Sequence, residues 1–131
     1  MAPTKDTIIK MANAYAKAWS SKDAAQVAAH YEPDGQIAIN RADPLVGTQA
    51  IAEMAAGFHS AFSDMHLMCD DIRVSGTHAV FVWTFYGHHS ETKNFVRLSG
   101  WEEWEISPAT KVQKSLGWFD AEDYEKQVAG H

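Results

Sequence analysis

The chain has 131 residues, of which 46% are hydrophobic and 21% are charged, and its formal net charge at pH 7 is −6. This length suits one domain with its own core, and we expect residues 1–131 to form a single domain. Eleven basic residues stand against seventeen acidic ones, without a basic cluster, which argues against nucleic acid and anionic membranes as partners.

Targeting signals and disulfides are not indicated. No apolar run reaches the length of a membrane span, and the first residues lack the charged-then-apolar layout of a secretory signal. Cys69 is the single cysteine of the sequence, so no internal disulfide can form, and a reducing compartment suits the chain. We therefore expect a cytoplasmic protein.

The first half of the sequence predicts three helices. Apolar residues recur at helical spacing over residues 6–19, and a short alanine-rich helix is expected over residues 24–30. Ser20 and Asp23 resemble a capping box for this second helix. The third helix is expected to begin with Thr48 as its N-cap. Its apolar stripe consists of Ile51, Met54, Ala55, Phe58 and Phe62.

The segment between the second and third helices reads as turn, strand and loop. Residues 31–35 have the composition of a turn, because Pro and Gly stand in turn-favouring company. Residues 36–40 predict a short strand, and residues 41–46 a loop.

The second half predicts a sheet. Four strands are expected, over residues 66–75, 79–88, 95–106 and 112–119. Their connections have the length of hairpins, which indicates a consecutive antiparallel meander. Asp120 is expected to cap a final short helix to about Val128. Helices followed by a meander predict an α+β fold in which the helices cover one face of the sheet.

The strand over residues 95–106 alternates with period two, the mark of a strand with one buried face. The apolar face carries Val96, Leu98, Gly100, Glu102, Trp104 and Ile106. Glu102 therefore points toward the core, where an ionised carboxyl is costly unless it is paired or neutral. The alternative is a one-residue bulge that turns Glu102 toward water.

Five segments carry a resemblance to a known family. They are residues 14–23, 30–37, 46–51, 83–84 and 104–106, and their order and spacing resemble the nuclear transport factor 2-like superfamily, in particular its ketosteroid isomerase and SnoaL-like polyketide cyclase branches. The resemblance implies a cone-shaped roll of N-terminal helices on a strongly curved antiparallel sheet, a cystatin-like arrangement. It also implies a pocket for a small apolar molecule.

The same resemblance implies catalytic residues. The oxyanion-hole tyrosine of the isomerase falls on Tyr15, and its second donor, a carboxyl kept protonated by an apolar setting, falls on Glu102. The general base of the isomerase falls on Ile39, which cannot accept a proton, so we expect ketosteroid isomerisation by that mechanism to be absent or very weak. The cyclase branch implies a pocket histidine at His89 and an acid at Asp120.

Each of these residues also has an ordinary structural interpretation. Tyr15 lies on the apolar stripe of the first helix and is also explained as a core tyrosine, and Asp120 is better explained as an N-cap. The expected pocket residues are Trp19, Ile39, Phe58, His59, Trp83 and Trp104. The seven histidines lack the spacing of metal ligands, so neither a metal nor an organic cofactor is expected.

The sequence thus predicts a small-molecule pocket protein, and the reaction class expected of it as an enzyme is cofactor-free proton transfer next to a carbonyl. The alternatives are a non-catalytic domain that binds an apolar ligand and a purely architectural module. The outward face of the strand over residues 95–106 offers Phe95 and Trp101 among charged residues, and large aromatics on an open sheet face are typical of a subunit interface. We therefore expect a homodimer with Trp101 near its axis.

Overall fold

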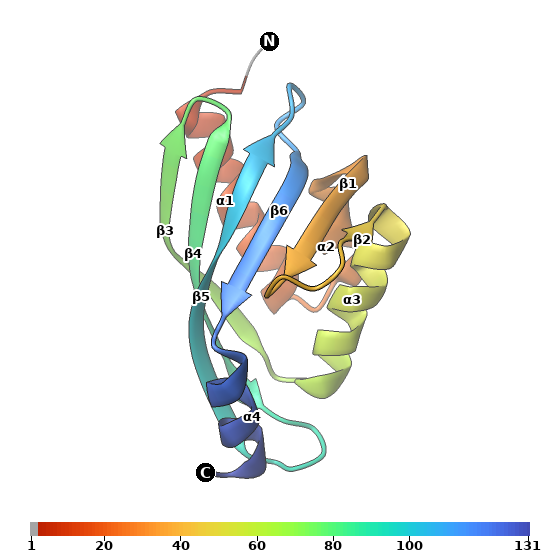
Figure 1. Cartoon of the computed structure of the whole chain (residues 1–131), viewed down its shortest axis with the longest axis vertical. Helices are drawn as coiled ribbons and strands as arrows, with labels where there is room; N and C mark the ends of the chain where they lie inside the picture. The colour runs from red at the N-terminus through yellow and green to blue at the C-terminus, as the bar shows by residue number, and fades with distance from the viewer. Residues whose placement is uncertain (1–2) are drawn as a thin grey trace.

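The computed structural model describes residues 3–131, in which the helices pack against one sheet (Figure 1). The helices are α1 (Lys5–Ser20), α2 (Ala24–Ala29), α3 (Thr48–Ala61) and α4 (Ala121–Ala129). The strands are β1 (Tyr31–Ile39), β2 (Leu45–Val46), β3 (His66–Ser75), β4 (His78–His88), β5 (Phe95–Ile106) and β6 (Val112–Phe119). The predicted α+β fold is confirmed (Figure 1).

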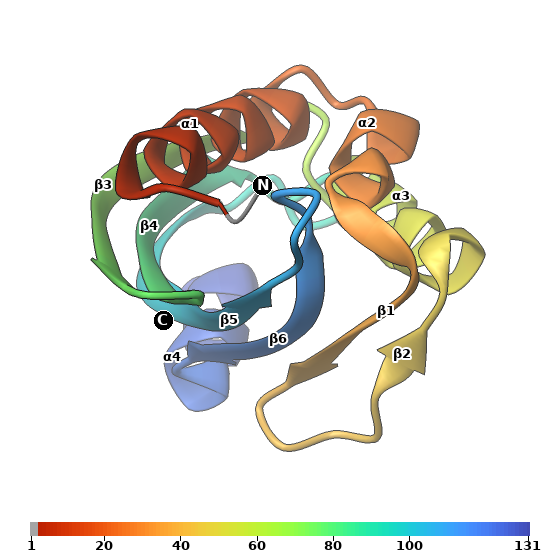
Figure 2. The ribbon, with the colours of Figure 1, turned by 90° about the horizontal axis from the view of Figure 1, so that it is seen from above.

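The strands form one curved sheet in the order β2-β1-β6-β5-β4-β3. The predicted antiparallel meander is confirmed, since β3, β4, β5 and β6 pair consecutively. The sequence did not predict that β1 joins β6 in parallel, or that the short β2 adds to β1 at the edge. Seen from above, the sheet curls around α1 without closing into a barrel, and α2 and α3 lie beside β1 (Figure 2).

The core lies between α1 and the concave face of the sheet. Helix α1 buries its apolar stripe there because its inward residues recur every three or four positions. The fully buried large side chains of this core include Tyr15, Tyr31, Phe62 and Phe81. Helix α4 packs against β5 at the far end of the sheet (Figure 1).

Residues 31–35, predicted as a turn, belong to β1, so that prediction was wrong. The pairing with β6 jumps from Tyr31↔Val112 to Gln36↔Lys114, so β1 holds extra residues that bulge out of the ladder. Gly35 is needed in the bulge, because a Cβ there would lie 2.9 Å from two backbone carbonyl oxygens. The turn-forming composition marks a bulge inside a strand.

The predicted N-cap of α3 was also wrong. The cap is Gly47, whose φ of 92° favours glycine, and Thr48 is the first helical residue. The Gly47 N–H donates to the Gly35 carbonyl at 2.8 Å, and the Gly47 carbonyl accepts from Ile51 at 3.1 Å. The helix therefore begins where the backbone turns away from β1.

The capping box predicted for α2 does not form. Asp23 caps α2 alone, accepting from the Gln26 N–H at 3.1 Å. Ser20 instead exchanges two hydrogen bonds with the backbone of Leu67, at 2.9 and 3.0 Å, and so joins the end of α1 to β3.

Strand β5 alternates between buried and exposed residues without interruption, and its pairing with β4 has no bulge at Glu102. The inward orientation predicted for Glu102 is confirmed, and the bulge alternative was wrong. On the outward face, Phe95 is 50% and Trp101 44% exposed. Among residues 3–131, no helix is both long and apolar enough to cross a membrane.

Candidate functional site

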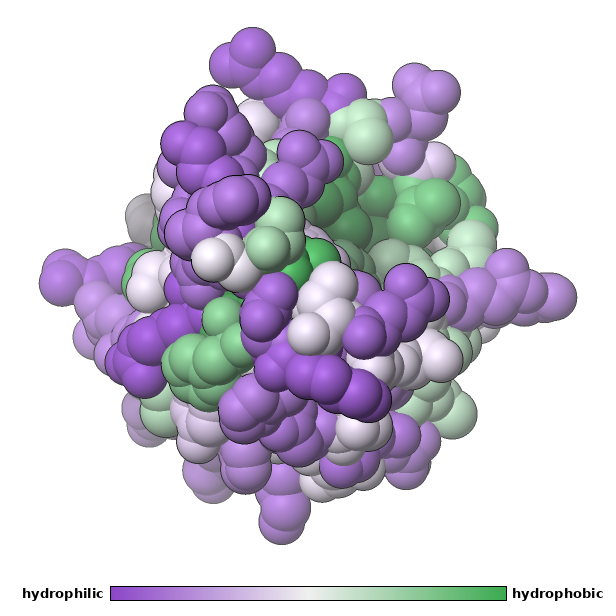
Figure 3. All heavy atoms as spheres, turned by 90° about the horizontal axis from the view of Figure 1, so that it is seen from below, coloured by the Kyte–Doolittle hydropathy of each residue, from purple (hydrophilic) through white to green (hydrophobic). Residues whose placement is uncertain are grey.

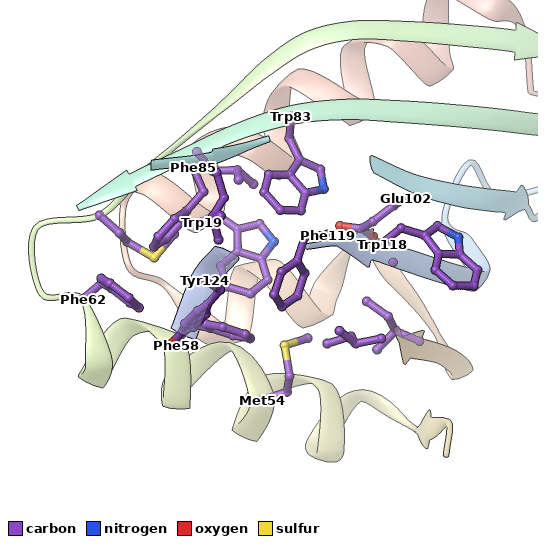
Figure 4. Close-up of a pocket in the computed structure, with 16 residues that line it drawn as sticks. Trp19, Met54, Phe58, Phe62, Trp83, Phe85, Glu102, Trp118, Phe119 and Tyr124 are labelled. Atoms are coloured by element: carbon purple, nitrogen blue, oxygen red, sulfur yellow. The ribbon is translucent and has the colours of Figure 1, made fainter. Parts of the chain in front are cut away.

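An apolar pocket opens among the concave face of the sheet, α3 and α4 (Figure 4). Its volume is about 90 Å³, several times the ~10–15 Å³ that one water molecule needs. Viewed from the end that carries α4, apolar side chains gather in a recess of the surface (Figure 3). The aromatic residues of the lining are Trp19, Phe58, Phe62, Trp83, Phe85, Trp118, Phe119 and Tyr124.

Glu102 is the one carboxylic acid of this lining within residues 3–131. It is placed there by the inward phase of β5, and its side chain is 6% exposed. Its neighbours across the sheet are Phe81 on β4 and Gly117 on β6. Figure 4 shows the Glu102 side chain extending from β5 toward the pocket, near Phe119.

Four neutral donors surround the Glu102 carboxyl. Oε1 accepts hydrogen bonds from Ser115 Oγ at 2.8 Å, from Trp104 Nε1 at 2.9 Å and from the Tyr31 hydroxyl at 3.2 Å. The Tyr15 hydroxyl lies 3.2 Å from Oε1 and 3.1 Å from Oε2. Of the four donors, only Tyr15 contacts Oε2.

Burial raises the pKa of Glu102, and the four hydrogen bonds lower it without cancelling the effect of burial. Burial, together with the adjacent Glu102 charge, also raises the pKa of Tyr15 and of Tyr31 well above that of a free phenol. Both tyrosines therefore stay protonated at neutral pH and can donate. The protonated form of Glu102 is favoured relative to that of an exposed glutamate.

The indole N–H of Trp19 has no hydrogen-bond partner within residues 3–131, although the nitrogen is buried. It approaches the Tyr15 hydroxyl and lowers the pKa of that group, but does not reach hydrogen-bond geometry. Trp19 also lines the pocket. An unpaired buried donor costs free energy, and this nitrogen is directed at Tyr15 and not open to the pocket.

The structure brings Tyr15 and Glu102 together, as the resemblance implied, but in a different arrangement. Tyr15 is fully buried and lies outside the pocket lining, behind Glu102. Its hydroxyl is engaged by Glu102 and by Tyr31, the latter at 3.0 Å. A ligand in the pocket therefore meets Glu102 first, and Tyr15 acts on the ligand through Glu102.

Of the expected pocket residues, Trp19, Ile39, Phe58 and Trp83 line the pocket. Trp104 does not, since its ring is 2% exposed and stacks on Phe81 with a centroid distance of 5.0 Å. It contributes as a donor to Glu102 instead.

His59, His89 and Asp120 lie outside the lining. The His59 Nε2 atom bonds to the Trp19 carbonyl oxygen at 3.1 Å, and burial lowers the pKa of His59. His89 packs its ring edge against Phe62, and its Nδ1 accepts from a backbone N–H at 3.3 Å. Asp120 is an exposed N-cap of α4.

Sequence reasoning missed two donors and one gap in the lining. Tyr31 was placed in a turn, and neither Ser115 nor Gly117 was among the expected site residues. A signal was available for Ser115 and Gly117, because both fall on the inward side of a strand that pairs with β5. Within residues 3–131, no three metal-ligating side chains gather.

Comparison with known proteins identifies the family. Residues 12–111 match the model of the SnoaL-like domain. The chain belongs to the SnoaL-like family, within the nuclear transport factor 2-like superfamily. No curated protein matches the chain at a significant level.

Solved structures share the fold at low identity. A protein with a ketosteroid isomerase-like fold from Catenulispora acidiphila, solved with trimethylamine, is 13% identical, with a TM-score of 0.82 over 98% of this chain and 95% of that one. A protein from Jannaschia sp. CCS1, named for a SnoaL-like polyketide cyclase, is 10% identical, with a TM-score of 0.82 over 100% and 97% of the two chains.

An LEH-like epoxide hydrolase from M. tuberculosis is 15% identical, with a TM-score of 0.78 over 97% of this chain and 92% of that one. At these identities the likeness shows the fold alone. The names of these neighbours cover more than one chemistry, so function has to be argued from the site.

Proposed function

We propose that the chain binds a small apolar carbonyl compound and that protonated Glu102 donates a hydrogen bond to the carbonyl oxygen while a proton moves at the neighbouring carbon. The observation that carries the proposal is a buried carboxyl with a raised pKa on the wall of an apolar pocket. A neutral acid at this position stabilises the negative charge that develops on the oxygen as an enolate forms. The reaction needs no metal or organic cofactor.

The two oxygens of Glu102 have different environments. Oε1 accepts from Trp104, Ser115 and Tyr31, so its acceptor capacity is used. Among the residues that the structure describes, Oε2 is hydrogen-bonded by the Tyr15 hydroxyl alone. We therefore assign the proton to Oε2, from which it can be shared with a ligand oxygen, while Tyr15 and the Oε1 donors hold the carboxyl in place.

The Jannaschia neighbour named for polyketide cyclisation is consistent with a carbonyl ligand, because aldol ring closure passes through an enolate.

A second candidate is a non-catalytic domain that binds the same class of ligand. It is favoured by the absence of a base: among residues 3–131, no histidine, aspartate or second glutamate lines the pocket. Because Glu102 is protonated in the first candidate, proton removal from carbon there depends on a water molecule as the base. Binding and proton transfer therefore have to be measured separately.

The test uses two probes with wild type, Glu102→Gln and, as a control, Glu105→Gln, which removes an exposed carboxyl from the outward face of the same strand. Binding is measured with 2-naphthol, whose fluorescence reports its surroundings and whose oxygen resembles an enol. Proton transfer is measured as deuterium exchange next to the carbonyl of 2-tetralone in D₂O, by proton NMR.

Binding and exchange that are both weakened about tenfold or more in Glu102→Gln, but not in Glu105→Gln, support the enzyme. Binding without exchange above the buffer rate supports the non-catalytic candidate. If neither probe binds wild type at millimolar concentration, or if Glu102→Gln binds both as well as wild type does, the proposal is wrong.

A further inference from the structure

We infer that Gly117 forms a subsite beside Glu102 and selects ligands that present the edge of a flat, unsaturated ring to the carboxyl. This inference rests on the proposed function and specifies its substrate class. Gly117 lies on the inner face of β6, paired with Glu102 on one side and with Ile39 on the other. All three residues line the pocket.

Two other buried glycines of the sheet, Gly100 and Gly35, are required by packing. A Cβ on Gly100 would lie 2.4 Å from both a ring carbon of Trp83 and the Trp118 carbonyl oxygen. A Cβ on Gly35 would lie 2.9 Å from two backbone oxygens. Neither position can hold a side chain without movement of the backbone or of a large ring.

Gly117 is different. A Cβ built there would lie 3.8 Å from Glu102 Cγ, 3.8 Å from Ile39 Cγ1 and 3.9 Å from the Ala38 carbonyl oxygen, which are ordinary van der Waals distances. Its φ lies outside the left-handed region, so the backbone does not need glycine either. Neither sterics nor conformation explains a glycine at this position.

The missing side chain has one consequence at the site, which is space next to the carboxyl. Because Gly117 presents only backbone, the wall between Glu102 and Ile39 is flat. Phe119, two residues further along the same inner face, continues this wall with an aromatic ring. A planar ring fits against such a wall with its oxygen at Glu102, whereas a branched, tetrahedral group would need more depth.

The experiment adds methyl and hydroxymethyl groups at this position. Gly117→Ala and Gly117→Ser are compared with wild type and with Gly57→Ala, a control in α3 at which an added Cβ meets nothing within 4 Å. Thermal melts establish that each variant folds. The ligand probes are 2-naphthol and the single-ring phenol, and the carbon-13 shift of the Glu102 carboxyl is followed in each variant.

We expect both Gly117 variants to melt near wild type and to bind 2-naphthol about tenfold more weakly. Phenol binding should fall less, because the smaller ring can withdraw from the wall. Gly57→Ala should bind both probes as wild type does. The Glu102 shift should change little, since the hydrogen bonds to its carboxyl are left in place.

The outcomes separate this inference from the proposed function. Unchanged 2-naphthol affinity in both Gly117 variants, alongside weakened binding in Glu102→Gln, overturns the subsite and leaves the proposed function standing. Equal losses for phenol and 2-naphthol also overturn it, because the added group would then act at the carboxyl and not on the ring that lies along the wall. If wild type binds neither probe, the proposed function fails and the subsite fails with it.

Discussion

Replacing Glu102 by glutamine should change the pH dependence of stability in a defined direction. The pKa of Glu102 is raised in the folded protein above its ordinary value of 4.5. The folded state therefore binds the proton more tightly than the unfolded state does. The contribution of this tighter proton binding to the free energy of unfolding is fully present below pH 4.5. It is lost as the pH rises through the pKa of Glu102 in the folded state.

The size of the effect follows from the burial of the side chain. Each unit of pKa shift corresponds to about 1.4 kcal/mol, and within the window between the two pKa values wild type loses up to about 1.4 kcal/mol per pH unit. Glutamine at position 102 keeps a carbonyl oxygen as acceptor for Trp104 and Ser115, and it does not titrate. The stability of Glu102→Gln relative to wild type should therefore rise steadily across that window.

Urea unfolding of both proteins at half-unit steps from pH 4 to 8, at constant ionic strength, measures the difference. Glu105→Gln is the control for removal of one negative charge at an exposed site of the same strand. A difference that stays flat, or that moves in favour of wild type as the pH rises, would refute the reasoning. It would mean that the four donors outweigh burial and hold Glu102 ionised, and the proposed hydrogen-bond donation from Glu102 would fail with it.

Three further predictions address other parts of the structure. Ser115→Ala removes the 2.8 Å hydrogen bond to Glu102 and should lower the free energy of unfolding, measured by urea titration, by about 1–2 kcal/mol at pH 8. The loss should be smaller at pH 5, and equal losses at the two pH values would contradict the raised pKa of Glu102. Gly100→Ala should cost more than about 3 kcal/mol because its Cβ meets atoms at 2.4 Å, and a melt like that of wild type would contradict it. Wild type should scatter light as a dimer and Trp101→Glu as a monomer, because a charge replaces a 44% exposed aromatic on the open sheet face; a wild-type mass of one chain would end that idea.

The sequence was most informative where one element alone decides the outcome. Period-two alternation in β5 needs no partner strand to be recognised, and it placed Glu102 inward. Helical periodicity likewise placed Tyr15 on the buried face of α1. The strands β3 to β6 were predictable because hairpin connections join neighbours in sequence.

The remainder depended on contacts between distant segments. Tyr31 reaches Glu102 only because β1 pairs in parallel with β6, and the bulge hides the strand pattern of residues 31–35. His89 and Asp120 follow the ends of β4 and β6, and a strand end can lie outside the pocket that the strand centres line. Position along a strand was the missing information for both residues.

The donors around Glu102 explain how one carboxyl can be kept in an apolar core and still exchange a proton. No lysine, arginine or histidine contributes to its pKa. A cation beside Glu102 would hold the carboxyl ionised. An apolar side chain at position 102 could leave the folded protein as stable as wild type. Tyr15, Tyr31, Trp104 and Ser115 are neutral donors, and the hydroxyl oxygens of Tyr15, Tyr31 and Ser115 can also accept a hydrogen bond from the protonated carboxyl. Burial raises the pKa of Glu102 and the hydrogen bonds lower it, so the two effects partly cancel. A residue that takes part in proton transfer needs a pKa near the working pH.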